Sequence, residues 1–137
     1  MKKIAVVVSR GSHNSVVQVM TLVMASVVSE VAVRLFFRDE AVYKLTRNGA
    51  GRINLSEIQQ AHEPGFSQRL KEHKLGDIQQ LIQEVKRQGD VRVYVCSSSV
   101  ALCGVREDDL IPEVDEIRGL TSFLLEEIAG ADKVLTF

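Results

Sequence analysis

The chain has 137 residues, of which 45% are hydrophobic and 26% are charged, and its formal net charge is −1. These values are ordinary for one globular domain, and a chain of this length buries enough apolar surface to fold without a metal or disulfide staple. The balanced charge lacks the basic excess that nucleic acid or an anionic membrane attracts. We therefore expect a single domain over residues 1–137 that does not bind nucleic acid.

Two hydrophobic stretches near the N-terminus must be distinguished from targeting and membrane segments. The run Ile4–Val8 is too short for a signal sequence, and Arg10 follows it closely. The stretch 16–33 is interrupted by polar residues such as Gln18 and Glu30, so a buried helix followed by a strand explains it better than a membrane span. Two cysteines are too few for a secreted disulfide framework. These features predict a cytoplasmic protein without a membrane span.

The first half of the chain predicts two buried strands around a helix. Residues 4–8 form a continuous, β-branched apolar run, which is typical of a strand buried on both faces of a parallel sheet. A polar turn over 9–15 leads into residues 16–28, which carry apolar side chains around most of a helix. Residues 31–37 predict the second strand.

The middle of the chain is less regular. A short helix is expected over 41–45, and Asn48-Gly49-Ala50-Gly51 is a strong turn signal. We expect a long loop over 46–65 with one helical turn near 55–60. Long loops inside compact domains often serve as lids or interface segments.

The second half continues the alternation of helices and strands. Residues 75–88 place apolar side chains at the spacing of an amphipathic helix, and Gly89 is a natural stop. The remaining expected elements, in order, are a strand over 91–95, helical turns over 100–103 and 107–110, a weak strand over 114–117, a helix over 120–128 and a strand over 133–137. This alternation predicts a doubly wound α/β domain with a parallel sheet and helices on both faces.

Ligands of open parallel sheets bind outside the carboxyl ends of the strands. Three segments should converge there: Ser9–His13, Arg38-Asp39 and Cys96–Ser99. Cys96 follows a buried strand, and if residues 97–103 are helical, it lies at a helix N-terminus that favours a thiolate. A thiolate is the nucleophile and the carrier of a persulfide. A buried, inert cysteine is an equally good interpretation of the position alone.

The second cysteine, Cys103, does not form a familiar motif with Cys96. Seven residues of helix separate them by roughly 10 Å along the axis, whereas a disulfide needs Cα atoms within about 7 Å. The spacing is not that of a dithiol oxidoreductase, and no cluster has zinc-finger spacing. Cys103 is therefore expected to be a packed small residue, and we expect no metal and no cofactor.

The first loop offers hydroxyl, guanidinium and backbone N–H groups that suit an anion, from Ser9, Arg10, Gly11 and Ser12. It matches neither the P-loop nor the dinucleotide-binding motif, so a plain turn between strand and helix is favoured. His13 is a candidate general base near Cys96, although an exposed capping-region histidine is the preferred interpretation. The histidines at 62 and 73 and the charged runs 69–74 and 107–109 are expected on the surface.

The residues around Cys96 resemble a known family signature. The segment Val93-Tyr-Val-Cys96-Ser-Ser-Ser99-Val-Ala-Leu-Cys-Gly104-Val105 is similar to the Cys-x-x-Ser-x-x-x-x-Gly motif of the DsrE/DsrF-like family, especially its branch once labelled peroxiredoxin-like. The opening strand and turn, the second strand and the closing region 107–137 agree in order. The similarity is poor over 46–74.

This resemblance implies a three-layer α/β/α domain with a five-stranded parallel sheet, commonly assembled as homo-oligomers. It also implies that Cys96 carries sulfur as a persulfide between donor and acceptor proteins, with Ser99 and Gly104 at the other motif positions. Two departures are Ser97-Ser98, where bulkier residues are usual, and Cys103, where this branch often has Met. A second thiol there could resolve a persulfide.

Two hypotheses of different classes follow. In the first, the protein is a sulfur carrier or sulfurtransferase: Cys96 is the nucleophile, residues 97–99 supply N–H groups to its anion, and Arg10 or Arg38 supplies positive charge. In the second, a non-enzymatic module binds a small anion or a partner protein through the first loop and 46–74, and Cys96 is structural. A thiol peroxidase is the weakest interpretation because the chain lacks Thr-x-x-Cys.

For an oligomer interface, the aromatic candidates are Phe36, Phe37, Tyr43 and Phe66, the first two being equally suited to the core.

Overall fold

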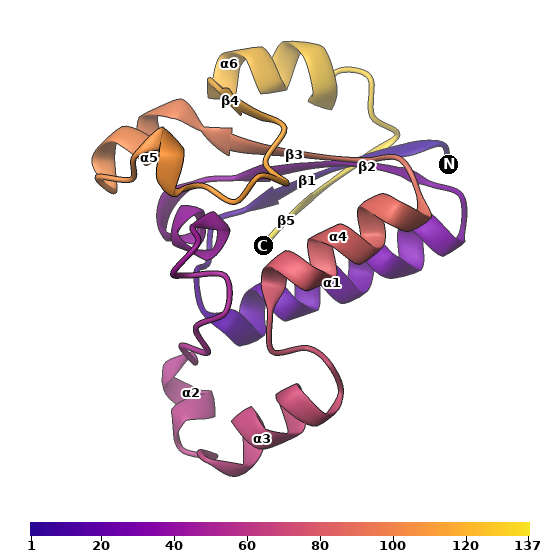
Figure 1. Cartoon of the computed structure of the whole chain (residues 1–137). Coiled ribbons are helices and arrows are strands. Elements are labelled where there is room, and N and C mark those ends of the chain that lie inside the picture. The colour runs from indigo at the N-terminus through magenta and orange to yellow at the C-terminus, as the bar shows by residue number, and fades with distance from the viewer.

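The computed structural model describes residues 1–137 and contains one five-stranded sheet in which all neighbouring strands are parallel (Figure 1). The strand order is β4-β3-β2-β1-β5, so the last strand joins the sheet beside the first. The strands are β1 (Lys3–Val8), β2 (Ala32–Phe37), β3 (Val91–Cys96), β4 (Glu116–Arg118) and β5 (Lys133–Thr136). The predicted α/β fold with a five-stranded parallel sheet is confirmed.

Helical segments lie on both faces of the sheet and at its carboxyl edge (Figure 1). They are α1 (His13–Val28), the 3₁₀ helix η1 (Asp39–Leu45), α2 (Glu57–Gln60), α3 (Gly65–Glu72), α4 (Ile78–Gln88), α5 (Ser97–Leu102), the 3₁₀ turn η2 (Glu107–Asp109), α6 (Leu120–Phe123) and the π-helical turn η3 (Leu124–Ile128). None of these helices combines the length and apolar composition needed to cross a bilayer.

The face of the sheet under α1 and α4 holds most of the hydrophobic core. Side chains alternate along a strand, and those of Val33, Leu35 and Phe37 point to this face and are fully buried. They pack with Met20 of α1 and Ile82 of α4 in a cluster of 26 buried residues. We call this the α1/α4 face.

The opposite face, which α6 and η3 cover, has a much smaller core. It is a cluster of five buried residues: Ala5, Phe36, Tyr94, Cys96 and Phe123. The rings of Phe36 and Phe123 are stacked with centroids 4.6 Å apart, and Tyr94 meets Phe123 edge-on at 5.8 Å. We call this the α6 face. Phe36 and Phe37 are thus core residues rather than interface residues, while Tyr43 is exposed.

The ends of several elements differ from the prediction because side chains cap them. Helix α1 begins at His13, three residues earlier than expected, since the Ser12 hydroxyl accepts the Ser15 N–H. Helix α4 begins later than expected, at Ile78, because the Asp77 carboxylate caps it. Strand β4 is displaced from the predicted 114–117 to 116–118.

The segment between η1 and α4, of which residues 46–65 were expected to be a loop with one helical turn, contains two helices that project from the body below the sheet (Figure 1). Helix α2 corresponds to the expected turn. Helix α3 was not predicted, while the charged residues of the run 69–74 are exposed, as predicted, and only Leu70 of this helix is buried. His62 and His73 are exposed, as predicted.

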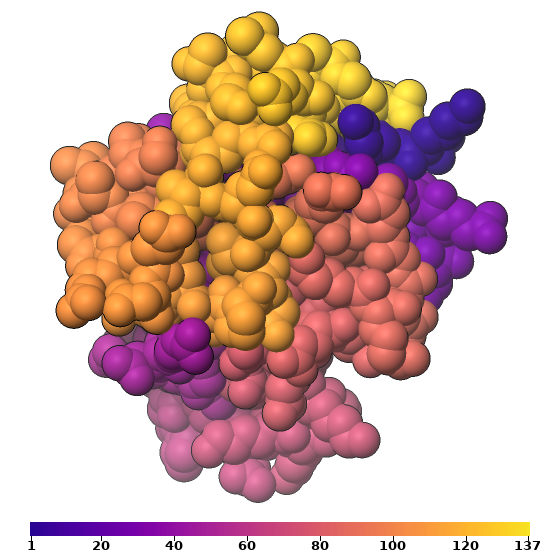
Figure 2. All heavy atoms as spheres, turned by 45° about the horizontal axis from the view of Figure 1, so that its top comes forward, coloured from indigo at the N-terminus to yellow at the C-terminus, as the bar shows by residue number.

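The segment that follows η2 packs beside α4, and Figure 2 shows its orange atoms next to the salmon atoms of that helix. The Glu113 carboxylate accepts hydrogen bonds from Gln79 and Gln83 of α4 at 2.8 and 2.9 Å. Asp115 pairs with Lys86 at 2.6 Å and accepts the Val93 N–H at 2.7 Å. These bonds hold the approach to β4 against the body.

Candidate functional site

Cys96 is the last residue of β3 and the residue immediately before α5. The strand and the following helix meet without a loop, so the amides of the first turn of α5 lie next to this side chain. Cys96 belongs to the α6 face, among aromatic side chains, and is only 2% exposed. The structure therefore places the sulfur at the carboxyl edge of the sheet, as predicted, but covers it.

The Cys96 thiol is nevertheless surrounded by hydrogen-bond donors. Its Sγ lies 3.2 Å from the Ser98 Oγ. Burial, the largest single cause, raises the pKa of the Cys96 thiol. Hydrogen bonds from the Ser98 hydroxyl, from the Ser99 amide and hydroxyl, and from the Ser98 amide lower this pKa, and together they outweigh the effect of burial. The pKa of Cys96 consequently lies below the ordinary value for a thiol. A lowered pKa favours the thiolate, which is the nucleophilic form of cysteine.

Ser99 joins the first turn of α5 to the end of β2. It is buried, and its Oγ accepts the N–H of Asp39 at 2.8 Å. Asp39 has a left-handed backbone with φ of 49°, which is uncommon outside glycine, so this contact stabilises a strained turn. Ser97, by contrast, is exposed. Of the three predicted serines, Ser98 and Ser99 thus interact with the sulfur environment most directly.

Cys103 lies at the other end of α5 and contacts η1. Its Sγ is 3.7 Å from the Asp39 carbonyl oxygen, and its own carbonyl accepts from the Tyr43 hydroxyl at 3.4 Å. Both cysteines are free thiols. Cys103 is only partly buried, so the predicted packed residue also borders a surface hollow of about 300 Å³.

The first-loop residues are not gathered around Cys96. Ser9 donates from Oγ to the Phe137 carbonyl at 2.9 Å, and the Gly11 N–H donates to Glu40 at 3.2 Å. Ser12 caps α1, and Arg10 is exposed. No hydrogen bond connects any of them to the sulfur or to Ser98, so this loop forms contacts with η1, α1 and the C-terminus.

Arg38, the predicted cation after β2, is half-buried. Its Nε is sealed from solvent without a hydrogen-bond partner, and lies 3.9 Å from the Asp39 carboxylate. A buried guanidinium nitrogen without an acceptor is unusual in a folded protein. Neither a hydrogen bond nor an ion pair joins Arg38 to Cys96.

His13 is a correction to the prediction of an exposed histidine. It is fully buried, and its Nε2 and Nδ1 lie 2.8 Å from the Leu75 carbonyl oxygen and 3.0 Å from Lys44 Nζ. Because ammonium is only a donor, Nδ1 accepts from Lys44 and Nε2–H donates to Leu75. Burial lowers the pKa of His13 most, the Leu75 hydrogen bond raises it, and the charge of Lys44 lowers it. Both ring nitrogens of His13 are already hydrogen-bonded, so His13 is not positioned to act as a general base toward Cys96.

Lys44 was not anticipated from the sequence. It is 1% exposed, and besides His13 it donates to the Arg52 carbonyl and to Asn54 Oδ1. Burial lowers the pKa of Lys44 to about 8, with a further lowering by Arg52 and an opposing effect of Asp77. Its side chain borders a cavity of about 440 Å³ at the carboxyl ends of β1 and β2. The only available signal was a lysine inside the apolar run 41–45.

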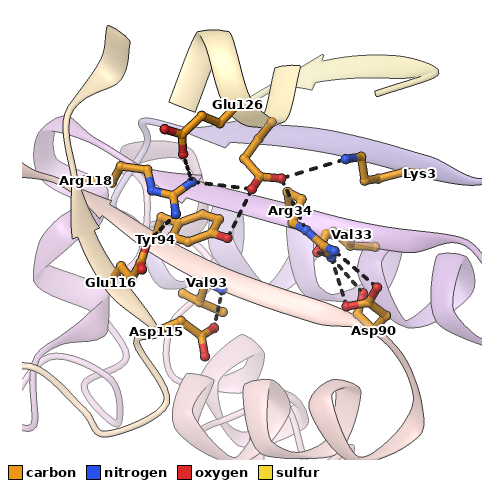
Figure 3. A network of polar contacts seen from close by, with 11 residues as sticks. Lys3, Val33, Arg34, Asp90, Val93, Tyr94, Asp115, Glu116, Arg118 and Glu126 are labelled. Carbon is orange, nitrogen blue, oxygen red and sulfur yellow. Dashed lines mark hydrogen bonds and ion pairs between the residues drawn. The ribbon is translucent and has the colours of Figure 1, made fainter. Parts of the chain in front are cut away.

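A polar network lies between β2, β3, β4 and the turn η3 on the α6 face (Figure 3). Glu127 is at its centre: it pairs with Arg34 at 3.3 Å and with Arg118 at 3.4 Å, and accepts from the Tyr94 hydroxyl at 3.3 Å. The Arg118 guanidinium also lies over the Tyr94 ring, 4.3 Å from its centroid. Arg118 is paired in the sheet with Cys96, so this network fixes the strand beside the thiol.

No group of three or more His, Cys, Asp and Glu side chains is arranged to hold a metal ion. The fold and the site together define a three-layer α/β/α domain with a thiol at the carboxyl edge of its sheet. The chain belongs to the DsrE/DsrF-like family, whose model matches residues 2–137. This match includes the segment 46–74, in which the resemblance to the family is poorest. The family is generally linked to sulfur relay.

A solved structure has the same fold. The chain is similar to the protein of unknown function MTH1491 from Methanobacterium thermoautotrophicum, with 16% sequence identity, a TM-score of 0.67 and full coverage of both chains. At this identity the likeness shows the fold alone. No curated protein matches the chain.

Proposed function

We propose that this protein is a cytoplasmic sulfur carrier or sulfurtransferase that holds sulfur as a persulfide on Cys96. The observation that carries the proposal is the set of donors from Ser98 and Ser99 that lowers the pKa of a thiol at the carboxyl edge of the sheet. Membership of a family linked to sulfur relay supports the same chemistry. Neither a metal nor an organic cofactor is needed for it.

The reaction is an exchange between sulfur atoms without net oxidation. The Cys96 thiolate attacks the terminal sulfur of a donor persulfide, the donor's S–S bond breaks, and its inner sulfur leaves as a thiolate with the electron pair. The new persulfide on Cys96 passes its outer sulfur to an acceptor thiolate in the same way. Because Cys96 is 2% exposed, donor and acceptor reach it only when its cover moves. Sulfur donor and acceptor proteins are the proposed partners.

The direct test is mass spectrometry of the protein after incubation with polysulfide. We expect a gain of one sulfur atom that reducing agent removes, that persists in Cys103→Ser and that is absent in Cys96→Ser. Circular dichroism of both variants controls for folding. A gain located only on Cys103, or no gain while the native protein remains folded, would overturn the proposal.

The burial of Cys96 favours a second function, in which the thiol is structural and the protein is a non-enzymatic module for a small anion or a partner protein. In that case Cys96→Ser retains the ligand affinity of the native protein. Loss of affinity in this variant, with the fold intact, would exclude the module.

We also propose that the protein assembles as a homo-oligomer. Large apolar side chains are exposed on α6, η3, the edge strand β5 and the residue after it, where burial in a subunit interface would stabilise them: Leu120, Leu124, Leu125, Val134 and Phe137. Light scattering during size-exclusion chromatography should give a mass above that of one chain. Leu125→Glu should shift the protein toward the monomer, and a native protein that is monomeric at high concentration would contradict this part of the proposal.

A further inference from the structure

The cavity at the carboxyl ends of β1 and β2 is separate from the Cys96 thiol and has a different composition. Its volume is about 440 Å³, and of the nine residues that line it only Tyr43 is hydrophobic. A volume of this order is within the range of small-molecule sites, which usually have mostly apolar walls. A cavity with polar walls instead selects a small polar ligand.

Hydrogen bonds hold the ammonium group of Lys44 in one position beside this cavity. Its three N–H bonds are used by Arg52 O, Asn54 Oδ1 and His13 Nδ1, all of which are neutral acceptors. No carboxylate lies within ion-pair distance of its ammonium group, since the salt bridges of the chain do not include it. Lys44 therefore contributes positive charge to the cavity, but none of its N–H groups is available to donate a hydrogen bond to a ligand.

Two further charges line the cavity and are not paired with one another. The Arg52 guanidinium makes no hydrogen bond or ion pair within the chain, although its carbonyl accepts from Lys44. The Glu40 carboxylate accepts the Gly11 N–H through Oε2, and its other oxygen has no protein partner. Both side chains are exposed, so a solvated guanidinium and a solvated carboxylate oxygen, neither with a protein partner, line the same cavity.

Two glycines that line the cavity, Gly11 and Gly49, lie very close to the backbone of η1. A Cβ on Gly11 would lie 2.6 Å from the Glu40 carbonyl oxygen, and a Cβ on Gly49 would lie 1.8 Å from that of Tyr43. No larger residue fits either position without moving η1. These contacts hold the backbone of both glycines against η1, and backbone that is already ordered lowers the entropic cost of binding.

We propose that this cavity binds a small zwitterion of the α-amino acid class. Its carboxylate would pair with Arg52 in the field of Lys44, and its ammonium group would pair with Glu40. A simple anion would be repelled by Glu40, and a simple cation by Lys44 and Arg52. A ligand that carries both charges satisfies the unpaired group on each side. This proposal is independent of the chemistry of Cys96.

The test is a thermal-shift screen of the native protein with each common L-amino acid at millimolar concentration, followed by titration of the best ligand. We expect at least one amino acid to raise the melting temperature and to shift the Gly11 and Gly49 amide resonances. Its N-acetyl derivative and its carboxamide should each bind at least about tenfold more weakly, because each lacks one charge-assisted contact.

Variants of the two free charges complete the test. Arg52→Gln and Glu40→Gln should each weaken binding at least about tenfold, whereas Arg92→Gln and Glu57→Gln, which change exposed charges elsewhere, should not. Cys96→Ser should bind as the native protein does, so failure of sulfur transfer does not affect the outcome. The proposal is overturned if no amino acid binds, if the N-acetyl derivative binds equally well, or if Arg52→Gln retains full affinity.

Discussion

The two faces of the sheet are held by different forces. The α1/α4 face packs 26 buried apolar residues against two long helices, whereas the α6 face has a core of five and relies on the network around Glu127. The free energy gained by apolar burial is proportional to the apolar area that is removed from water. A network of ion pairs and hydrogen bonds can form around a small, partly solvated core.

This contrast explains where each type of chemistry is located. The thiol lies on the α6 face, where the covering helix has four residues and the core has five, so we expect local opening to cost less there than on the α1/α4 face. The buried Lys44 and His13 lie at the end of the α1/α4 face, where large packed elements hold a charge in place. The proposed sulfur transfer thus requires opening of the face with the smaller core.

The largest effect should come from a cavity in the α1/α4 face. Leu35→Ala removes a fully buried side chain from the centre of β2 and should lower the free energy of unfolding by about 2–5 kcal/mol. Urea denaturation measures it. Val7→Ala, which trims a half-buried residue on the α6 face, should cost much less. Equal losses for both variants would contradict the difference between the faces.

The next effect concerns the buried cation. Lys44→Met leaves the Arg52 carbonyl, the Asn54 amide oxygen and His13 Nδ1 without their donor, which should cost about 1–3 kcal/mol in urea denaturation at neutral pH. The exposed Lys71→Met is the matched control and should be nearly neutral. A Lys44→Met variant more stable than the native protein would show that desolvation of the charge outweighs its hydrogen bonds.

The same lysine should make stability depend on pH. The folded protein holds the pKa of Lys44 at about 8, below the unfolded value of about 10.4, so between these values the unfolded chain binds more protons. The native protein should therefore gain stability relative to Lys44→Met as the pH rises from about 8 to about 10.4. His13 and Asp77 face the same group, but both variants keep them, so the difference isolates Lys44. A constant difference across this range would refute the assignment.

On the α6 face, Glu127→Gln keeps the shape of the side chain and removes its charge. Arg34 and Arg118 retain Asp90 and Glu116 as partners, so we expect a loss of only about 1 kcal/mol in the free energy of unfolding. Glu126→Gln, at an exposed position, should cost less still. A loss as large as that of Leu35→Ala would mean that the network, and not apolar packing, is the main stabilising feature of the sheet.

The strands could be predicted from the sequence because β-branched apolar runs are a local signal. Helix α3 could not, because it begins at Pro64-Gly65 and buries only Leu70, so it lacks an apolar face. Strand β4 begins two residues later than predicted. It has only three residues, and the residue before it, Asp115, accepts the Val93 N–H through its side chain. Short elements are placed by distant partners, and those are not visible in a local pattern.

The two candidate sites differ in the same way. Cys96 was predicted because a cysteine directly after a buried strand lies at the edge where such sheets bind ligands. The Lys44–His13 pair was missed because its environment depends on Leu75, Arg52 and Asn54, which the fold brings together from separate loops. A buried charge is recognisable only when its partners are known.

The smallest effect tests the donors of the thiol on the α6 face. Ser98→Ala removes the hydroxyl 3.2 Å from the Cys96 sulfur but keeps the backbone amides of residues 98 and 99. The pKa of the thiol should therefore rise, but not as far as that of a buried cysteine without any hydrogen-bond donor. The pH dependence of thiolate absorbance in a Cys103→Ser background measures it. Ser97→Ala, which changes an exposed hydroxyl of the same turn, should leave the titration unchanged. If Ser98→Ala leaves it unchanged as well, the backbone amides and Ser99 alone lower the pKa of the thiol, and the exposed hydroxyl of Ser98 has no effect on it.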